Sequence, residues 1–168
     1  MNITSNTTLL QEGHPVRNYF QENDIIHVLL GLLTSINSMN DLQKYINVFN
    51  QLYTIEKRFI RKENQLFPFL EKKGWDGPSQ GMWFFHDNLR DQFRLMRYYI
   101  RTKNLEKINI NTTFLVSGIY RLMQVEETVL FPKALQLLNE EDWITMRKGE
   151  EEIGWMLPEP PAAYPNPE

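Results

Sequence analysis

A proline-containing hexapeptide that occurs twice constrains this chain more than any other feature. Residues 63–68 read ENQLFP, and 64 residues later residues 127–132 read ETVLFP. Each copy places a glutamate five residues before a proline, inside a segment whose apolar residues recur at helical spacing. Because proline cannot donate a hydrogen bond to the carbonyl group four residues back, we expect each helix to kink about one turn after its glutamate. A kink at that level would widen a helical bundle beside two carboxylates.

Four long amphipathic segments predict an all-α fold, an antiparallel up-down four-helix bundle with a short extra C-terminal helix. The apolar periodicity predicts long helices over residues 14–37, 42–72, 80–102 and from 111 or 112 to 138, and a shorter one over 139–156. No β-branched alternation supports a sheet. We expect residues 1–12 to form a flexible arm, residues 13–157 the bundle domain, and residues 158–168 a proline-rich tail that is extended or disordered.

The composition excludes several classes of function. The 168 residues include no cysteine, which excludes disulfides, thiolate metal sites and thiol catalysis. The net charge of −3 gives no push toward nucleic acid or an anionic membrane. The first residues have neither a basic nor an apolar segment, so we expect no signal peptide, and we find no membrane-spanning apolar run, nucleophile triad or phosphate-binding glycine loop. We therefore expect a cytoplasmic binding protein more than an enzyme, with a protein partner left open.

Arginines follow one side of the third predicted helix, opposite its apolar stripe. They are spaced at steps of four, three and four residues: Arg90, Arg94, Arg97 and Arg101. Acidic residues, Asp87 and Asp91, lie beside them in the sequence. Mixed charges of this kind are typical of a solvated helix face, so we predict neither a nucleic-acid site nor a phosphate site here.

Histidine and glutamate side chains fall on the apolar stripes and predict a metal site in the bundle. The four candidates come one from each long helix: His14, Glu63, His86 and Glu127. A buried carboxylate is costly unless a positive charge neutralises it, and a metal ion can do so. Carboxylate and imidazole ligands together suit iron, with one or two ions, and also manganese or zinc.

Further acidic residues on the inner faces are second-tier candidates for metal ligation: Glu22, Glu56 and Glu126. Glu126 and its neighbour Glu127 differ by only about 100° around a helix, so either could point inward. We prefer Glu127, because its distance to the following proline equals that of Glu63.

The order and spacing of several short motifs resemble the hemerythrin-like cation-binding family, and in particular its branch often attached to sensory domains. The matching segments span about residues 13–157 and are 13–16, 22–23, 61–68, 77–87, 126–132 and 141–143. The resemblance implies a four-helix bundle around an oxo-bridged di-iron centre with histidine ligands and bridging carboxylates. It also implies binding of dioxygen, nitric oxide or iron itself.

This chain departs from the family pattern because it has only three histidines. Arg58 and Phe59 stand where relatives commonly place a ligand histidine before the first glutamate. Arg17 stands where a second histidine often follows His14, and Met82 stands one turn before His86 where other hemerythrins have a histidine. A complete di-iron site cannot be assembled from these residues, which leaves a carboxylate-rich, mononuclear or lost site.

Three functions remain open on the sequence. The first is a non-haem, iron-type protein that senses, binds or stores iron, dioxygen or nitric oxide. The second is a haem-binding bundle that uses His86 or His14 as an axial ligand. The third is a metal-free interaction module in which Arg17 and Arg58 neutralise the carboxylates that a metal would otherwise neutralise.

Overall fold

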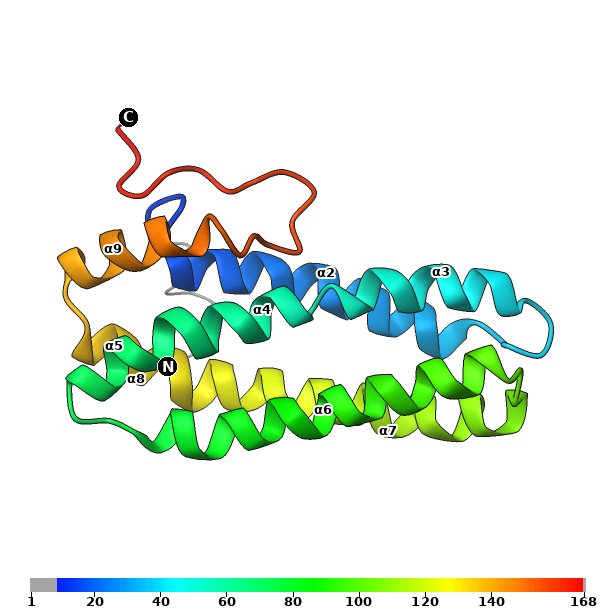
Figure 1. Cartoon of the computed structure of the whole chain (residues 1–168). Coiled ribbons are helices and arrows are strands. Elements are labelled where there is room, and N and C mark those ends of the chain that lie inside the picture. The colour runs from blue at the N-terminus through cyan, green and yellow to red at the C-terminus, as the bar shows by residue number, and fades with distance from the viewer. Residues whose placement is uncertain (1–8, 168) are drawn as a thin grey trace.

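In the computed structural model, which describes residues 9–167, the chain forms an antiparallel bundle of four helical rods (Figure 1). The first rod is α2 (Pro15–Ser35). The second is made of α3 (Leu42–Tyr53), α4 (Glu56–Arg61), η1 (Lys62–Leu66) and α5 (Phe67–Lys72). The third is α6 (Gly77–Arg101), and the fourth is made of α7 (Leu105–Val125), η2 (Glu126–Leu130) and α8 (Phe131–Leu137). The short α9 (Glu140–Glu150) follows, so the predicted fold class is confirmed.

Side-chain caps set the starts of α2, α3, α7 and α9. The His14 side chain accepts the Val16 N–H ahead of α2, and Asp41 accepts the Lys44 N–H ahead of α3. Asn104 accepts the Lys107 N–H, so the fourth rod begins at Leu105, several residues before the predicted start. The third rod likewise begins early, at Gly77, with a proline in its first turn.

Each proline of the repeated hexapeptide follows a π-helical turn. In η1 the Phe67 N–H donates to the Lys62 carbonyl, five residues back, and in η2 the Phe131 N–H donates to the Glu126 carbonyl. This wider turn lets each rod continue past a residue that has no N–H to donate. The backbone is thus altered at both prolines, and the altered turn contains the glutamate instead of following it.

The core combines an apolar interior with a band of buried charge. Large aromatic residues fill the interior along the rods, and the fully buried ones include Tyr19, Tyr45, Phe49, Phe59, Phe67, Phe93 and Phe131. Charged residues that are also fully or almost fully buried include Glu22, Arg58, Arg61, Lys62, Glu63 and Glu126. Most of these belong to η1, η2 and the turn before η1, so the charged band lies at the level of the two π-helical turns.

The C-terminal segment folds back beside the first rod. Figure 1 shows α9 and the tail running along α2. Arg147 donates to the carbonyls of Pro161 and Ala162, and the Tyr164 side chain is buried. Gly13 has φ +79° and approaches the Ala162 carbonyl so closely that a Cβ would lie 2.4 Å from its oxygen. The described part of the tail forms bends and irregular structure, and it is packed against the bundle.

The two ends of the chain differ in part from the elements predicted for them. Of the predicted arm over residues 1–12, residues 1–8 lie outside the described part, and residues 9–12 form turns. The helix predicted over 139–156 ends at Glu150, before turns that include Gly154 at φ +86°. In the described part of the chain, no helix is both long and apolar enough to cross a membrane.

Candidate metal centre and the buried ion network

Lys62 and Glu126 each stand immediately before one copy of the repeated hexapeptide, and each is the first residue of a π-helical turn. Both side chains are fully buried, and Lys62 Nζ lies 3.2 Å from Glu126 Oε2. Lys62 Nζ also lies 2.7 Å from His86 Nε2. The repeat thus brings a cation, a carboxylate and an imidazole together in the centre of the bundle.

His86 is held as a neutral ring. Its Nδ1 lies 2.8 Å from Glu63 Oε1, and its ring stacks on Phe59 with the centroids 4.5 Å apart. Because the Lys62 ammonium can only donate, Nε2 of His86 accepts, and the ring proton lies on Nδ1 and is donated to Glu63. Burial first, and the Lys62 charge next, hold the pKa of His86 far below its usual range.

Arg58 joins the two halves of the network. Its Nη2 lies 2.9 Å from Glu126 Oε2, and its Nη1 lies 3.3 Å from Glu22 Oε2. The same Nη1 donates to the Tyr19 carbonyl at 2.8 Å, which ties the guanidinium to the α2 backbone. Arg58 therefore bridges carboxylates from the first and fourth rods.

Arg61 completes the neutralisation of Glu22. Its Nη1 and Nη2 lie 2.7 and 2.6 Å from the two Glu22 oxygens, in a bidentate pair. Burial by itself would raise the pKa of Glu22 and of Glu126, but the neighbouring cations outweigh it, so the pKa of each carboxyl is lowered. For Glu22 those cations are Arg61 and Arg58.

These residues define an interior ion network whose charges balance: Glu22, Arg58, Arg61, Lys62, Glu63, His86 and Glu126. Three cations face three carboxylates, and the imidazole is neutral. At the rim, Arg90 contacts both Glu63 and Glu56, with its Nη1 2.8 Å from Glu63 Oε1. Arg90 also contacts the more exposed Asp87, with its Nη1 2.9 Å from Asp87 Oδ1, so the rim adds one cation and two carboxylates.

The charged form of Lys62 is disfavoured by its burial. Burial lowers its pKa to about 8, and Glu126 opposes this shift. The lowered pKa means that the ammonium is less well solvated here than in water. Its position between His86 and Glu126 nevertheless gives the ammonium two hydrogen-bonding partners.

Two of the four main metal candidates meet in this network, Glu63 and His86. His14 instead caps α2 and packs its ring on Trp143 and Tyr164, with centroid distances of 4.7 and 5.0 Å. Burial lowers the pKa of His14 to about 4. Glu127 is half-buried and accepts a hydrogen bond of 2.7 Å from Asn23 Nδ2.

The preference for Glu127 as the inward-facing glutamate is corrected by this geometry. Glu126 is fully buried, and Glu127 faces the α2 side of the bundle. In both π-helical turns the first residue, Lys62 or Glu126, is fully buried, so the distance to the proline did not identify the buried glutamate of the second turn.

The other candidates are divided between the interior and the surface. Glu22 and Glu126 lie in the interior ion network, and Glu56 lies at the rim beside Arg90. Among the proposed ligand replacements, Arg58 is fully buried, whereas Arg17 pairs with Glu12 near the surface. Met82 forms part of the wall of an apolar cavity of about 280 Å³ beside Trp75, Phe85 and Leu130.

Sequence reasoning missed Lys62 and Arg61 as members of the site, and it missed Glu150 entirely. Lys62 could have been found by extending the alignment of the two hexapeptides one residue toward the N-terminus, where it stands opposite Glu126. Glu150 on α9 is fully buried, and neither of its carboxyl oxygens has a hydrogen-bond partner among the described residues. Burial raises the pKa of Glu150 to about 7, and Arg61 only partly offsets it. No signal in the α9 sequence marks this position as interior.

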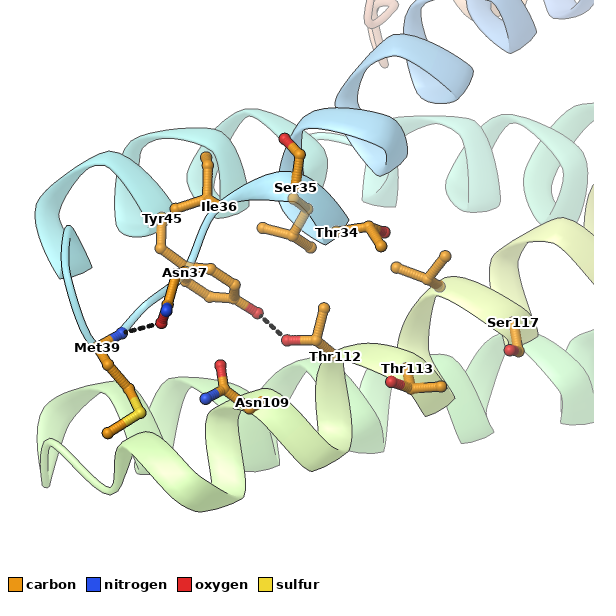
Figure 2. A pocket seen from close by; sticks show the side chains of 12 residues that line it. Thr34, Ser35, Ile36, Asn37, Met39, Tyr45, Asn109, Thr112, Thr113 and Ser117 are labelled. Carbon is orange, nitrogen blue, oxygen red and sulfur yellow. Dashed lines mark hydrogen bonds between the residues drawn. The ribbon is translucent and has the colours of Figure 1, made fainter.

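A second hollow lies at the other end of the bundle and has a different chemistry. Figure 2 shows this cavity of about 420 Å³ between the end of α2, the loop that follows it, and α7. Its walls carry hydroxyl and amide groups and no charged side chain. The Tyr45 hydroxyl lies 2.5 Å from Thr112 Oγ1, as drawn in Figure 2, and Thr112 donates to the Ile108 carbonyl. This cavity offers no imidazole or carboxylate to a metal.

A comparison with protein families decides what kind of bundle this is. Residues 14–134 match the family described as the Hemerythrin HHE cation binding domain, which covers most of the chain. This chain belongs to the hemerythrin family. No curated protein matches it at a significant level. Membership in this cation-binding family supports the general class of a metal-binding helical protein.

The residues of this hemerythrin-family chain do not fit a metal ion as they are arranged. In the described part of the chain, no three histidine, aspartate or glutamate side chains are grouped so that they could hold one. The nearest approach is Glu63, His86 and Glu126, and each already has a lysine or arginine within hydrogen-bonding distance. A divalent ion placed there would add two positive charges to a balanced network.

Proposed function

We propose that this hemerythrin-family chain is a binding module that works without a bound metal. The observation that carries the proposal is the Lys62 ammonium, 2.7 Å from His86 Nε2 and 3.2 Å from Glu126 Oε2. A cationic side chain of the protein thus lies against the imidazole and carboxylate atoms that a metal would need. Arg58 and Arg61 supply the remaining positive charge to Glu126 and Glu22.

The ion network then has a structural role. The three cations and three carboxylates come from the first, second and fourth rods and connect them through short contacts. His86 connects the third rod to the network. Buried ion pairs contribute little net stability, but removing one partner leaves an unpaired buried charge and typically costs about 3–5 kcal/mol. A network of this kind favours one arrangement of the rods and leaves the outer surface free for a partner.

The test is metal content and its effect on stability. Protein purified aerobically without a metal-binding tag should contain less than stoichiometric iron, manganese and zinc by elemental analysis. Its melting temperature should be unchanged by a chelator and by added Fe²⁺. One iron or more per chain, with a visible oxo-bridged di-iron band and a chelator-sensitive melting temperature, would overturn the proposal.

A variant separates a structural network from a metal site. Arg58→Met should lower the free energy of unfolding by about 3–5 kcal/mol, because Glu126 and Glu22 lose a buried partner. Lys57→Met, which removes an exposed positive charge one residue earlier, is the matched control and should change stability little. Equal effects of the two substitutions would contradict the structural role of Arg58.

Iron binding with sensing of dioxygen or nitric oxide is the competing proposal. It is supported by family membership and by the presence of Glu63, His86 and Glu126 in one network. It requires Lys62 and Arg58 to leave their present partners. The elemental analysis and visible spectrum described above distinguish it from metal-free function. A shifted Soret band on titration with haemin would instead support the haem-binding alternative through His86 or His14.

A further inference from the structure

The outer face of α6 carries arginines that the interior ion network does not use. Arg90 turns inward to Glu56 and Glu63, whereas Arg94, Arg97 and Arg101 are exposed. Among residues 9–167, Arg94 pairs only with Asp91, three residues earlier on the same helix, where both side chains are about two-thirds exposed. Such a pair contributes little and leaves Arg94 able to turn to another anion.

Aromatic rings hold two of these arginines in place. The Arg97 guanidinium lies 4.9 Å from the centre of the Tyr53 ring, and Tyr53 packs edge-on against the buried Phe93 at 5.4 Å. The Arg101 guanidinium lies 5.7 Å from the centre of the Tyr98 ring. Stacking of this kind engages the face of a guanidinium and leaves its N–H edge available. In the described part of the chain, neither arginine has a carboxylate within ion-pair distance.

The same residues surround a surface hollow. A cavity of about 430 Å³ is lined by Arg94, Arg97, Tyr98 and Arg101, with no acidic side chain in its wall. Three permanent positive charges therefore lie on one stretch of the outer face of α6, beside a tyrosine ring that is 51% exposed. The chain as a whole has a net charge of −3, so general attraction of anions to this protein is weak and any binding depends on this local arrangement.

We propose that this hollow binds a polyphosphate group, either free or carried by a nucleotide. Guanidinium groups donate paired N–H bonds that match the oxygens of a phosphate, and three of them suit more than one phosphate. The exposed Tyr98 ring offers a stacking surface to a base if the ligand is a nucleotide. The site is separate from the interior ion network, and it stands whether or not the metal-free proposal holds.

The experiment measures binding of sodium tripolyphosphate and of ATP to the full chain by isothermal titration calorimetry at low salt. Both ligands should bind one site per chain, and affinity should fall as salt is raised. Arg97→Gln and Arg101→Gln should each weaken binding of both ligands by roughly tenfold. Arg97→Lys keeps the charge and loses the paired N–H donors, so it should weaken binding by an intermediate factor.

Arg121→Gln is the matched control, because Arg121 is an exposed arginine on α7 outside the hollow. It should leave both affinities unchanged. Tyr98→Ala distinguishes the two sources of phosphate: an added loss for ATP alone assigns a nucleotide, and equal small changes assign a free polyphosphate. No binding of either ligand to folded wild-type protein would overturn the proposal, as would an equal loss in Arg121→Gln and Arg97→Gln.

Discussion

Replacing Glu150 by glutamine should stabilise the protein at neutral and alkaline pH and leave it unchanged in acid. Glu150 is fully buried, and its carboxyl oxygens have no hydrogen-bond partner among the described residues. Arg61, its main cationic neighbour, is already paired bidentately with Glu22. Burial therefore raises the pKa of Glu150 from 4.5 to about 7.

The size of the effect follows from this pKa difference. Because the folded state holds the Glu150 proton more tightly than the unfolded state does, the penalty is absent below pH 4.5, grows with rising pH and is complete above about pH 7. A difference of about 2.5 pKa units at 1.36 kcal/mol each corresponds to about 3 kcal/mol. For a domain of this size, that raises the melting temperature by roughly 6–12 °C at pH 8.

The assay is urea unfolding of wild type and Glu150→Gln between pH 4.5 and 8.5. The difference in free energy of unfolding should increase from near zero to about 3 kcal/mol across this range. Glu152→Gln removes the same charge from an exposed position two residues later and should give a difference that stays near zero. Parallel pH profiles for wild type and Glu150→Gln would refute the argument that Glu150 is ionised at the expense of stability.

Three further changes test other parts of the fold. His14→Asn keeps a capping acceptor and removes a buried imidazole whose pKa is lowered to about 4. Because the folded state resists protonation of His14, the wild type should lose about 3 kcal/mol of unfolding free energy as pH falls from 6.5 to 4, and the variant should not. Urea unfolding that shows the same pH dependence of the unfolding free energy in both proteins would contradict this. Gly13→Ala should expose the C-terminal tail to limited proteolysis, because a Cβ cannot fit against the Ala162 carbonyl, whereas Gly31→Ala, on an open helix surface, should not. Tyr45→Phe should cost about 1 kcal/mol by removing the hydrogen bond to Thr112, and thermal unfolding that matches wild type would argue against that bond.

Much of the architecture was predictable from local pattern. The helical rods and their antiparallel order follow from apolar periodicity, whereas π-helical turns before Pro68 and Pro132 stand in place of the kinks predicted after the glutamates. The start of the fourth rod was predicted too late, because the stretch after Asn104 is rich in asparagine and threonine and its periodicity is weak. The cap at Asn104 was the local signal that gave the true start.

The candidate site was predictable only in part. Glu63 and His86 were placed together by their apolar stripes, and they lie 2.8 Å apart. His14 was not brought to them, because its side chain is used at the start of α2 and its ring packs on α9 and the tail. Residues from outside the four long helices, such as Glu150, could not be assigned to the interior from a pattern of helical faces alone.

The sequence by itself determined that this chain is a helical bundle with acidic residues and a histidine on its inner faces, and with too few histidines for a complete di-iron site. Only the tertiary structure decided what neutralises those acids. Arg58 and Glu126 are 68 residues apart in the chain, and Lys62 and His86 are 24 apart, so no local pattern relates them. Lys62 and Glu126 begin the two π-helical turns and are fully buried, and a buried charge is costly unless it is paired. The pairing is therefore a property of the packed rods.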